Sequence, residues 1–152
     1  MTFDTIFYDR AECSIEERRK LLSTVDFLEM ISNKARREGL LSLEETVQSL
    51  DSSVLRTGLK LVVDGTDPII IQEVLSNLML GAHLRGKELL EAMVSATGVL
   101  AVQSGYHPRY VRLCSEAHLG LLQSEDGRPD SPLTVESVFE ALGPEADQST
   151  TS

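Results

Sequence analysis

The chain has 152 residues, a length at which a single hydrophobic core is expected. Apolar residues make up 41% and aromatic residues 5%, which excludes a chain disordered throughout and predicts a core built from aliphatic side chains. The formal net charge of −10 excludes nucleic acid as a natural partner, because binding to phosphates requires a cationic face.

The sequence also bears on cellular location. The longest apolar stretch, residues 68–84, contains Gln72, Glu73 and Asn77 and is too short and polar to span a bilayer. The first residues lack a basic segment followed by an apolar run, which is the mark of a secretory signal. We therefore expect a cytoplasmic protein that does not span the membrane, with Cys13 and Cys114 as free thiols.

The first half of the chain has helical periodicity. Ser14 and Glu17 have the spacing of a capping box, and apolar residues then recur every three or four positions, which predicts a helix over about 15–38 that ends before Gly39. A short helix is expected over 41–47, where Ser42 and Glu45 have the spacing of a second capping box.

Further helices are predicted over 51–63 and 68–79, the second with Asp67 as its cap and Pro68 in its first turn. Gly81 and Gly86 favour a turn between two antiparallel helices, with one kinked helix as the alternative. The remaining core helices are expected over 89–102 and from around Pro108 to 121. No segment alternates convincingly with period two, so the predicted fold is all-α, a compact bundle of about five helices.

Three regions follow from these patterns: an N-terminal arm over 1–13, a helical domain over 14–123, and an acidic linker and tail over 124–152. A short helix is expected near 134–142. Its apolar side chains can share one face and either recruit a partner or pack on the chain's own domain. These residues are Val135, Val138, Phe139 and Leu142.

No catalytic, cofactor-binding or metal-binding motif is present in the sequence, so an enzyme is not expected. The pair Cys114 and His118 has i, i+4 spacing but is interpreted as structural, with the cysteine packed and the histidine at the surface. The segment from Asp64 to Pro68 lacks the further oxygen ligands of a calcium loop and is explained by a helix stop and a cap.

One polar segment has two interpretations. Arg36 and Arg37 precede Gly39, and Glu44 and Glu45 follow it. Cations in a last helical turn and acids in a first turn both complement the helix dipole, which is a structural explanation. The functional alternative is a charged docking surface for another protein.

The same segment carries a resemblance to a known family. ARREGLLSLEE, followed by LRTGLKLVVDGTDPIIIQEVL, resembles the cytoplasmic loop of the MotA/PomA stator subunits of the bacterial flagellar motor. TGVLAVQSGYHPR resembles the segment after their last membrane helix. The matches cover roughly residues 20–115 in the family's order. Two of the family's four membrane helices lie between these segments, where this sequence has only GAHLRGK.

The resemblance implies a stator-like cytoplasmic domain without its membrane helices. In the family an Arg before the glycine and a Glu after it contact the rotor protein FliG, and these positions fall on Arg36 and Glu44. The expected function is therefore a soluble, non-catalytic motor accessory protein that binds FliG or a MotA-type stator subunit, in the cytoplasm near the inner membrane. The alternative is a general adaptor that recruits a partner through its C-terminal segment. A homo-oligomer is left open.

Overall fold

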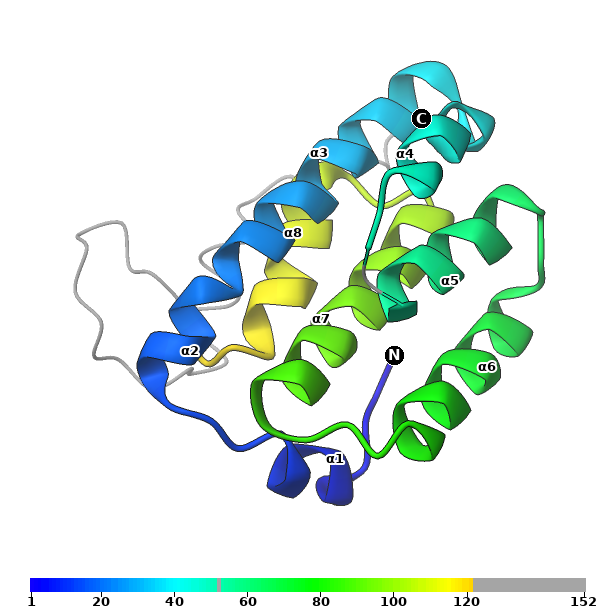
Figure 1. The fold of residues 1–152 in the computed structure, drawn as a ribbon. Coiled ribbons are helices and arrows are strands. Elements are labelled where there is room, and N and C mark those ends of the chain that lie inside the picture. Colours follow the sequence, from blue (N-terminus) through cyan, green and yellow to red (C-terminus); the bar gives the residue numbers. More distant parts are fainter. Residues whose placement is uncertain (52, 122–152) are drawn as a thin grey trace, which may run out of the picture. The chain divides into compact units, whose positions relative to one another are not determined.

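All regular secondary structure in residues 1–51 and 53–121, the part of the chain that our computed structural model describes, is helical. This confirms the predicted all-α class. The five longest helices are α3 (Leu22–Glu38), α5 (Ser53–Val63), α6 (Pro68–Gly81), α7 (Gly86–Gln103) and α8 (Pro108–Ala117) (Figure 1). The shorter ones are α1 (Thr5–Arg10), α2 (Ile15–Lys20), the 3₁₀ helix η1 (Leu40–Leu43) and α4 (Glu44–Gln48).

The expected C-terminal tail lies outside the described residues. The same holds for the helix expected near 134–142 and for its four apolar residues. Residues Met1–Leu121 form one unit, and the description below concerns this unit alone.

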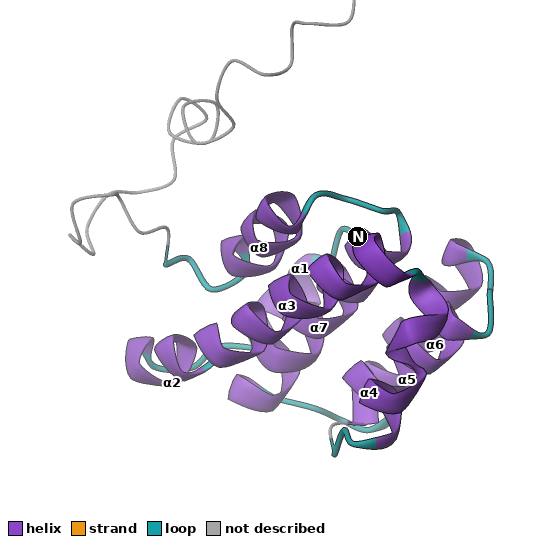
Figure 2. Cartoon of the chain, turned by 90° about the horizontal axis from the view of Figure 1, so that it is seen from above, coloured by secondary structure: helices purple, strands orange, loops and turns teal. Residues whose placement is uncertain are grey.

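Helix α7 is the centre of the unit. It packs against α3 and α8 on one side and against α5 and α6 on the other (Figures 1 and 2). Between Leu89 and Val102 nearly every residue is buried, including Met93 and Val94 with no exposed surface. A helix enclosed on most of its circumference needs apolar or small residues all round, and the sequence LLEAMVSATGVLAV supplies them.

The contact between α3 and α7 depends on Gly98. A β-carbon at this position would lie within 3.0 Å of the side chain of Leu28, which is itself fully buried. The missing side chain therefore lets the two helices approach closely. The requirement here is for space, because Gly98 does not have a positive φ.

Most helix ends lie where the sequence predicts them. Asp67 caps α6 by accepting a hydrogen bond from the Ile69 N–H at 2.8 Å, and Pro68 occupies its first turn. The chain reverses between α6 and α7 within residues 82–85, so the predicted hairpin is confirmed and the kinked helix is wrong. The positive φ angles there belong to His83 and Gly86.

The expected helix over 15–38 is wrong in one respect, because it is broken at Leu21 into α2 and α3. The capping box of Ser14 and Glu17 is present at the start of α2. At the break the Leu21 N–H bonds to the Arg18 carbonyl, three residues back, and the Leu21 side chain is buried. The apolar spacing continues through the break, so periodicity alone does not reveal it.

Residues 1–13, expected to be an arm, fold against the helical unit. Helix α1 packs on α7, and Phe7 of α1 lies in the core together with the flanking residues Phe3 and Ala11. The Arg10 guanidinium donates a hydrogen bond to the Leu84 carbonyl at 3.3 Å, which ties α1 to the turn between α6 and α7. The first residues therefore cover one end of the bundle.

Candidate docking site at a charged helix bend

The bend between α3 and α4 is built around Gly39. The Gly39 N–H bonds to the Ala35 carbonyl at 2.8 Å and closes the last turn of α3. Its φ of 86° is one that residues with a β-carbon adopt with difficulty, whereas the space around its Cα is open. Glycine is therefore required here by backbone conformation, and it redirects the chain from the cationic end of α3 into η1.

The start of the next helix differs from the sequence prediction. Ser42 and Glu45 do not form a capping box. The Ser42 hydroxyl instead donates to the Gly39 carbonyl at 2.6 Å, and α4 begins at Glu44 without a side-chain cap. The single 3₁₀ turn already occupies Ser42, so the expected helix over 41–47 is two elements.

That 3₁₀ turn produces an exposed apolar residue that the sequence interpretation missed. With three residues per turn, Leu40 and Leu43 share the inner side, and Leu43 is fully buried. Leu41 points outward and is 73% exposed. The only sequence signal for the exposure of Leu41 is the pattern LLSL after a glycine. Because this pattern also suits an amphipathic α-helix, it does not identify the 3₁₀ turn.

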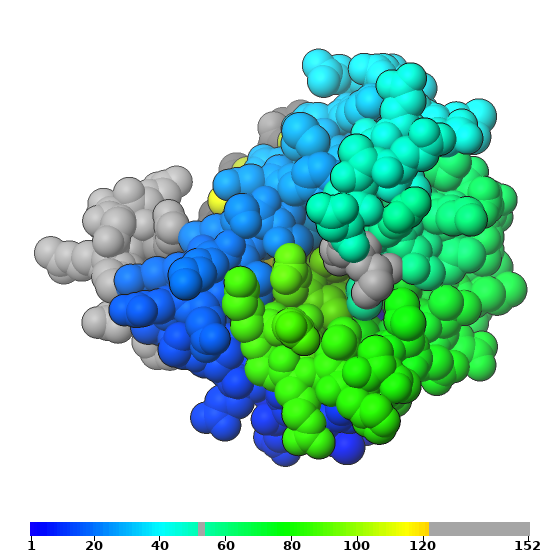
Figure 3. Space-filling model, viewed as in Figure 1, coloured from blue at the N-terminus to red at the C-terminus, as the bar shows by residue number. Residues whose placement is uncertain are grey.

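The charged corner, which we define as Arg36, Arg37, Glu44 and Glu45, lies exposed around this bend (Figure 3, cyan). None of the four takes part in an ion pair with a described residue. Arg36 donates one hydrogen bond, to the Gly105 carbonyl at 2.8 Å, which anchors the bend to the loop between α7 and α8. The structure thus brings the predicted site residues to one bend and leaves their charges facing solvent.

Two hollows adjoin the charged corner. One, of about 260 Å³, includes Glu44 and lies between α4 and α5, with residues Val47, Gln48, Arg56, Lys60, Val63 and Asp64. The other is shallow, has a volume of about 540 Å³, and includes Arg37 together with Asp26, Glu29, Met30 and Asn33 of α3. A partner seated on the bend would therefore meet mixed charges and apolar surface on both sides.

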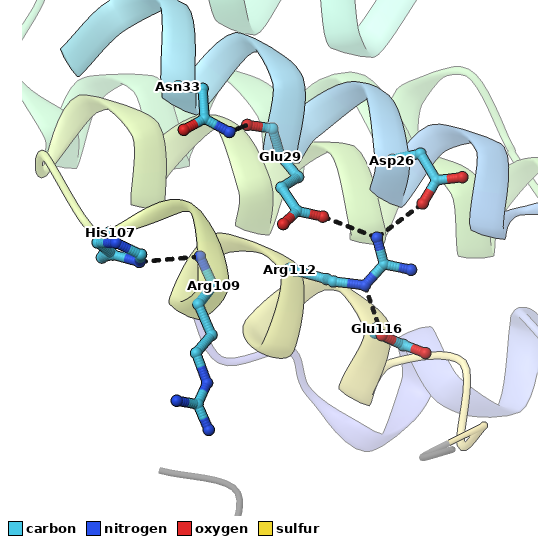
Figure 4. A network of polar contacts seen from close by, with 7 residues as sticks. All are labelled: Asp26, Glu29, Asn33, His107, Arg109, Arg112 and Glu116. Atoms are coloured by element: carbon cyan, nitrogen blue, oxygen red, sulfur yellow. Dashed lines mark hydrogen bonds and ion pairs between the residues drawn. The ribbon is translucent and has the colours of Figure 1, made fainter. Parts of the chain in front are cut away.

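A second charged cluster has a different character. Arg112 of α8 contacts Asp26 at 2.7 Å and Glu29 at 2.8 Å, both on α3, and Glu116 at 3.4 Å (Figure 4). These carboxylates raise the pKa of Arg112 further, and burial raises the pKa of Glu116. The two contacts that Arg112 makes across the helix interface join α8 to α3, so this cluster has a structural role. The neighbouring Arg109 points away from it.

The expectation that Cys114 is packed and His118 lies at the surface is wrong. Cys114 is exposed, while the imidazole of His118 lies against Phe3 and Tyr8 of the N-terminal segment. Its Nε2 lies 2.8 Å from the Thr97 hydroxyl and its Nδ1 3.2 Å from the Tyr8 hydroxyl. The histidine is therefore the packed residue, and burial lowers its pKa.

The half-buried His118 predicts a pH dependence of stability. Because its pKa is below that of the unfolded chain, the neutral ring favours the folded state above about pH 6.5, and this stabilisation is lost as the pH falls. We expect the stability difference between the wild type and His118→Gln to shrink between about pH 7.5 and pH 5. Urea unfolding at both pH values measures it, with His83→Gln, at an exposed histidine, as the control. A difference that is unchanged or grows would contradict the prediction.

Other kinds of site find no support in the described residues. No three histidine, cysteine or acidic side chains there are grouped closely enough to hold a metal ion. Among the same residues, no helix combines the length and apolarity that crossing a bilayer requires.

The described unit is thus an all-α domain with an exposed bend that has cations before it and acids after it. Parts of the chain are similar to Motility protein A from several bacteria, which confirms the resemblance found in the sequence over those parts. The Borreliella burgdorferi protein is 41% identical over 54 residues, which are 36% of this chain and 21% of that protein. The Treponema phagedenis protein is 45% identical over 53 residues, 35% of this chain and 20% of that protein. The Bacillus subtilis protein is 32% identical over 74 residues, 49% of this chain and 25% of that protein.

The matched region spans about a quarter or less of each of these relatives. No known family profile matches the chain, and no solved structure matches it.

Proposed function

We propose that this chain is a non-catalytic accessory protein of the bacterial flagellar motor that binds a motor component through its charged corner. The observation that carries the proposal is the exposure of opposite charges on a bend fixed by Gly39, outside any ion pair with a described residue. Similarity to Motility protein A supports the motor context. The proposed partners are the rotor switch protein FliG and a MotA-type stator subunit, at the cytoplasmic side of the inner membrane.

The arrangement of the corner suits recognition of a partner with its own paired charges. Opposite charges on both sides of one bend fix the orientation of a complementary surface and penalise a reversed one. Leu41, between them, offers an apolar contact that charges alone do not provide. The Arg36 bond to Gly105 limits the freedom of that side chain, so less entropy is lost on binding.

Charge reversal tests the proposal. Arg37→Glu and Glu44→Lys are each expected to weaken binding to purified FliG or to a MotA-type subunit, by about fivefold or more, since an exposed contact contributes up to about 1 kcal/mol and reversal adds repulsion. Binding is also expected to weaken with added salt. Isothermal titration calorimetry with each partner separately measures both effects. Arg37 is preferred to Arg36 because Arg36 also holds the bend.

The matched controls lie on α2, at the opposite end of α3 (Figure 1). Arg19→Glu reverses an exposed cation, and Glu16→Lys reverses an exposed acid in a first helical turn, as Glu44→Lys does. Both controls are expected to bind like the wild type. The role of the charged corner would be contradicted if Arg37→Glu and Glu44→Lys bound as tightly as the wild type. It would also be contradicted if the control variants lost as much affinity as these two.

A further inference from the structure

Helix α6 exposes a second surface, separate from the charged corner. One side of the helix is core, with Ile71, Leu75 and Met79 fully buried. Other apolar residues of the same helix lie at the surface, which no described element covers. We define the α6 face as these four residues: Ile69 (76% exposed), Ile70 (51%), Val74 (37%) and Leu80 (38%).

The segment that carries the α6 face is acidic between its two flanking cations, Lys60 and Arg85. Residues 61–84 contain Asp64, Asp67 and Glu73 and no lysine or arginine, so the segment carries −3. All three acids are exposed. The α6 face therefore has two apolar pairs, Ile69 with Leu80 and Ile70 with Val74, and the exposed Glu73 and Asn77 lie between them on the helix surface.

The dimensions of the face fit a short helix. From Ile69 to Leu80 the helix rises about 16 Å, or three turns. A partner helix of similar length places apolar residues on one side at i, i+3, i+4 and i+7. Helix α6 lies at the edge of the unit (Figure 1). Its main contacts among the described helices are with α5 and α7.

We propose that the α6 face binds a cationic amphipathic helix of a partner protein. Its apolar side covers Ile70 and Val74, and its lysines or arginines lie beside Asp67 and Glu73. A second copy of this chain is less suited, because its α6 would bring further acids and no cation to the contact. An anionic lipid surface is repelled by the same acids. The proposal is independent of what binds the charged corner.

The test is a titration of the full ¹⁵N-labelled chain with a synthetic amphipathic helix of leucine and lysine, followed by NMR. We expect amide shift changes centred on residues 68–81, and binding at least about tenfold weaker for the same peptide with glutamate in place of lysine. Ile70→Ser combined with Val74→Ser is expected to weaken binding by about tenfold or more. Ile69→Ser, at the most exposed position, serves as a second variant if the double variant does not fold.

Leu41→Ser is the matched control for Ile69→Ser, because it removes an apolar side chain of similar exposure at a distant position, beside the charged corner. It is expected to leave binding unchanged. The proposal is overturned if the shift changes lie outside 68–81, or if wild type and the α6 variants bind the peptide equally. It is also overturned if the α6 amides shift with the protein's own concentration in the absence of peptide, because a second copy then occupies the face.

Discussion

Gly98→Ala is expected to lower the free energy of unfolding by about 1–3 kcal/mol. The added methyl group would lie within 3.0 Å of Leu28, in the contact between α3 and α7. Leu28 has no exposed surface, so its side chain cannot move aside without disturbing other core residues. Alanine's higher helix propensity offsets up to about 1 kcal/mol of the cost. Urea unfolding of the full chain measures the change.

Gly81→Ala is the matched control for this prediction. Gly81 is also a helical glycine without a positive φ, but a β-carbon there has no neighbour within 4 Å. Its replacement is expected to leave stability unchanged or raise it by up to about 1 kcal/mol. If both variants stabilise the protein, the contact between α3 and α7 has room for a β-carbon at position 98, and the prediction is wrong.

A double-mutant cycle separates crowding from other effects. Leu28→Ala alone is expected to cost about 2–5 kcal/mol through the cavity it leaves. In the double variant the Gly98→Ala methyl group fills part of that cavity, so the two costs should sum to more than the measured loss. Additive costs would show that the residues do not interact.

The second large effect is expected at Arg112. Arg112→Leu leaves the carboxylates of Asp26, Glu29 and Glu116 close together without their cation. Glu116 has a side chain only 11% exposed, so its charge is poorly hydrated. We expect a loss of about 1–3 kcal/mol at neutral pH, below the cost of breaking a fully buried pair because Arg112 is 35% exposed.

Acid should reduce this loss. Burial already raises the pKa of Glu116, and the other two carboxylates raise it further. Without Arg112 the folded state binds a proton here still more readily, so the variant regains stability relative to the wild type as the pH falls. Urea unfolding at about pH 7 and pH 4.5 tests this sign. Arg109→Leu, on the same helix and directed away from the cluster, is expected to change stability by less than about 0.5 kcal/mol.

The sequence was sufficient to predict the helix ends that depend on local chemistry. Gly39 and the pair Asp67–Pro68 act through their own backbone or side-chain hydrogen bonds, so their effect is visible in a few neighbouring residues. The break at Leu21 and the helix over Thr5–Arg10 were missed. The break preserves the apolar spacing, and α1 is shorter than a helix that is stable alone, so tertiary packing decides both.

The same distinction applies to the candidate site. The four charges of the charged corner are close in sequence and could be found from spacing and dipole arguments. The contacts of Arg112 with Asp26 and Glu29 join residues more than 80 positions apart, so no local sequence pattern predicts them. The α6 face was missed for a related reason. The sequence shows a helix that is apolar on most sides, but only the structure shows which side is left uncovered.

The turn at residues 82–85 has a consequence for how such a domain can change over evolution. It joins α6 to α7 through a few residues at the surface, so the polypeptide leaves the bundle and re-enters it at neighbouring points. A segment whose own ends lie near each other fits between those points without displacing either helix. Loss or gain of a long insert at this position therefore leaves the sequences of the other helices, and the contacts between them, unchanged.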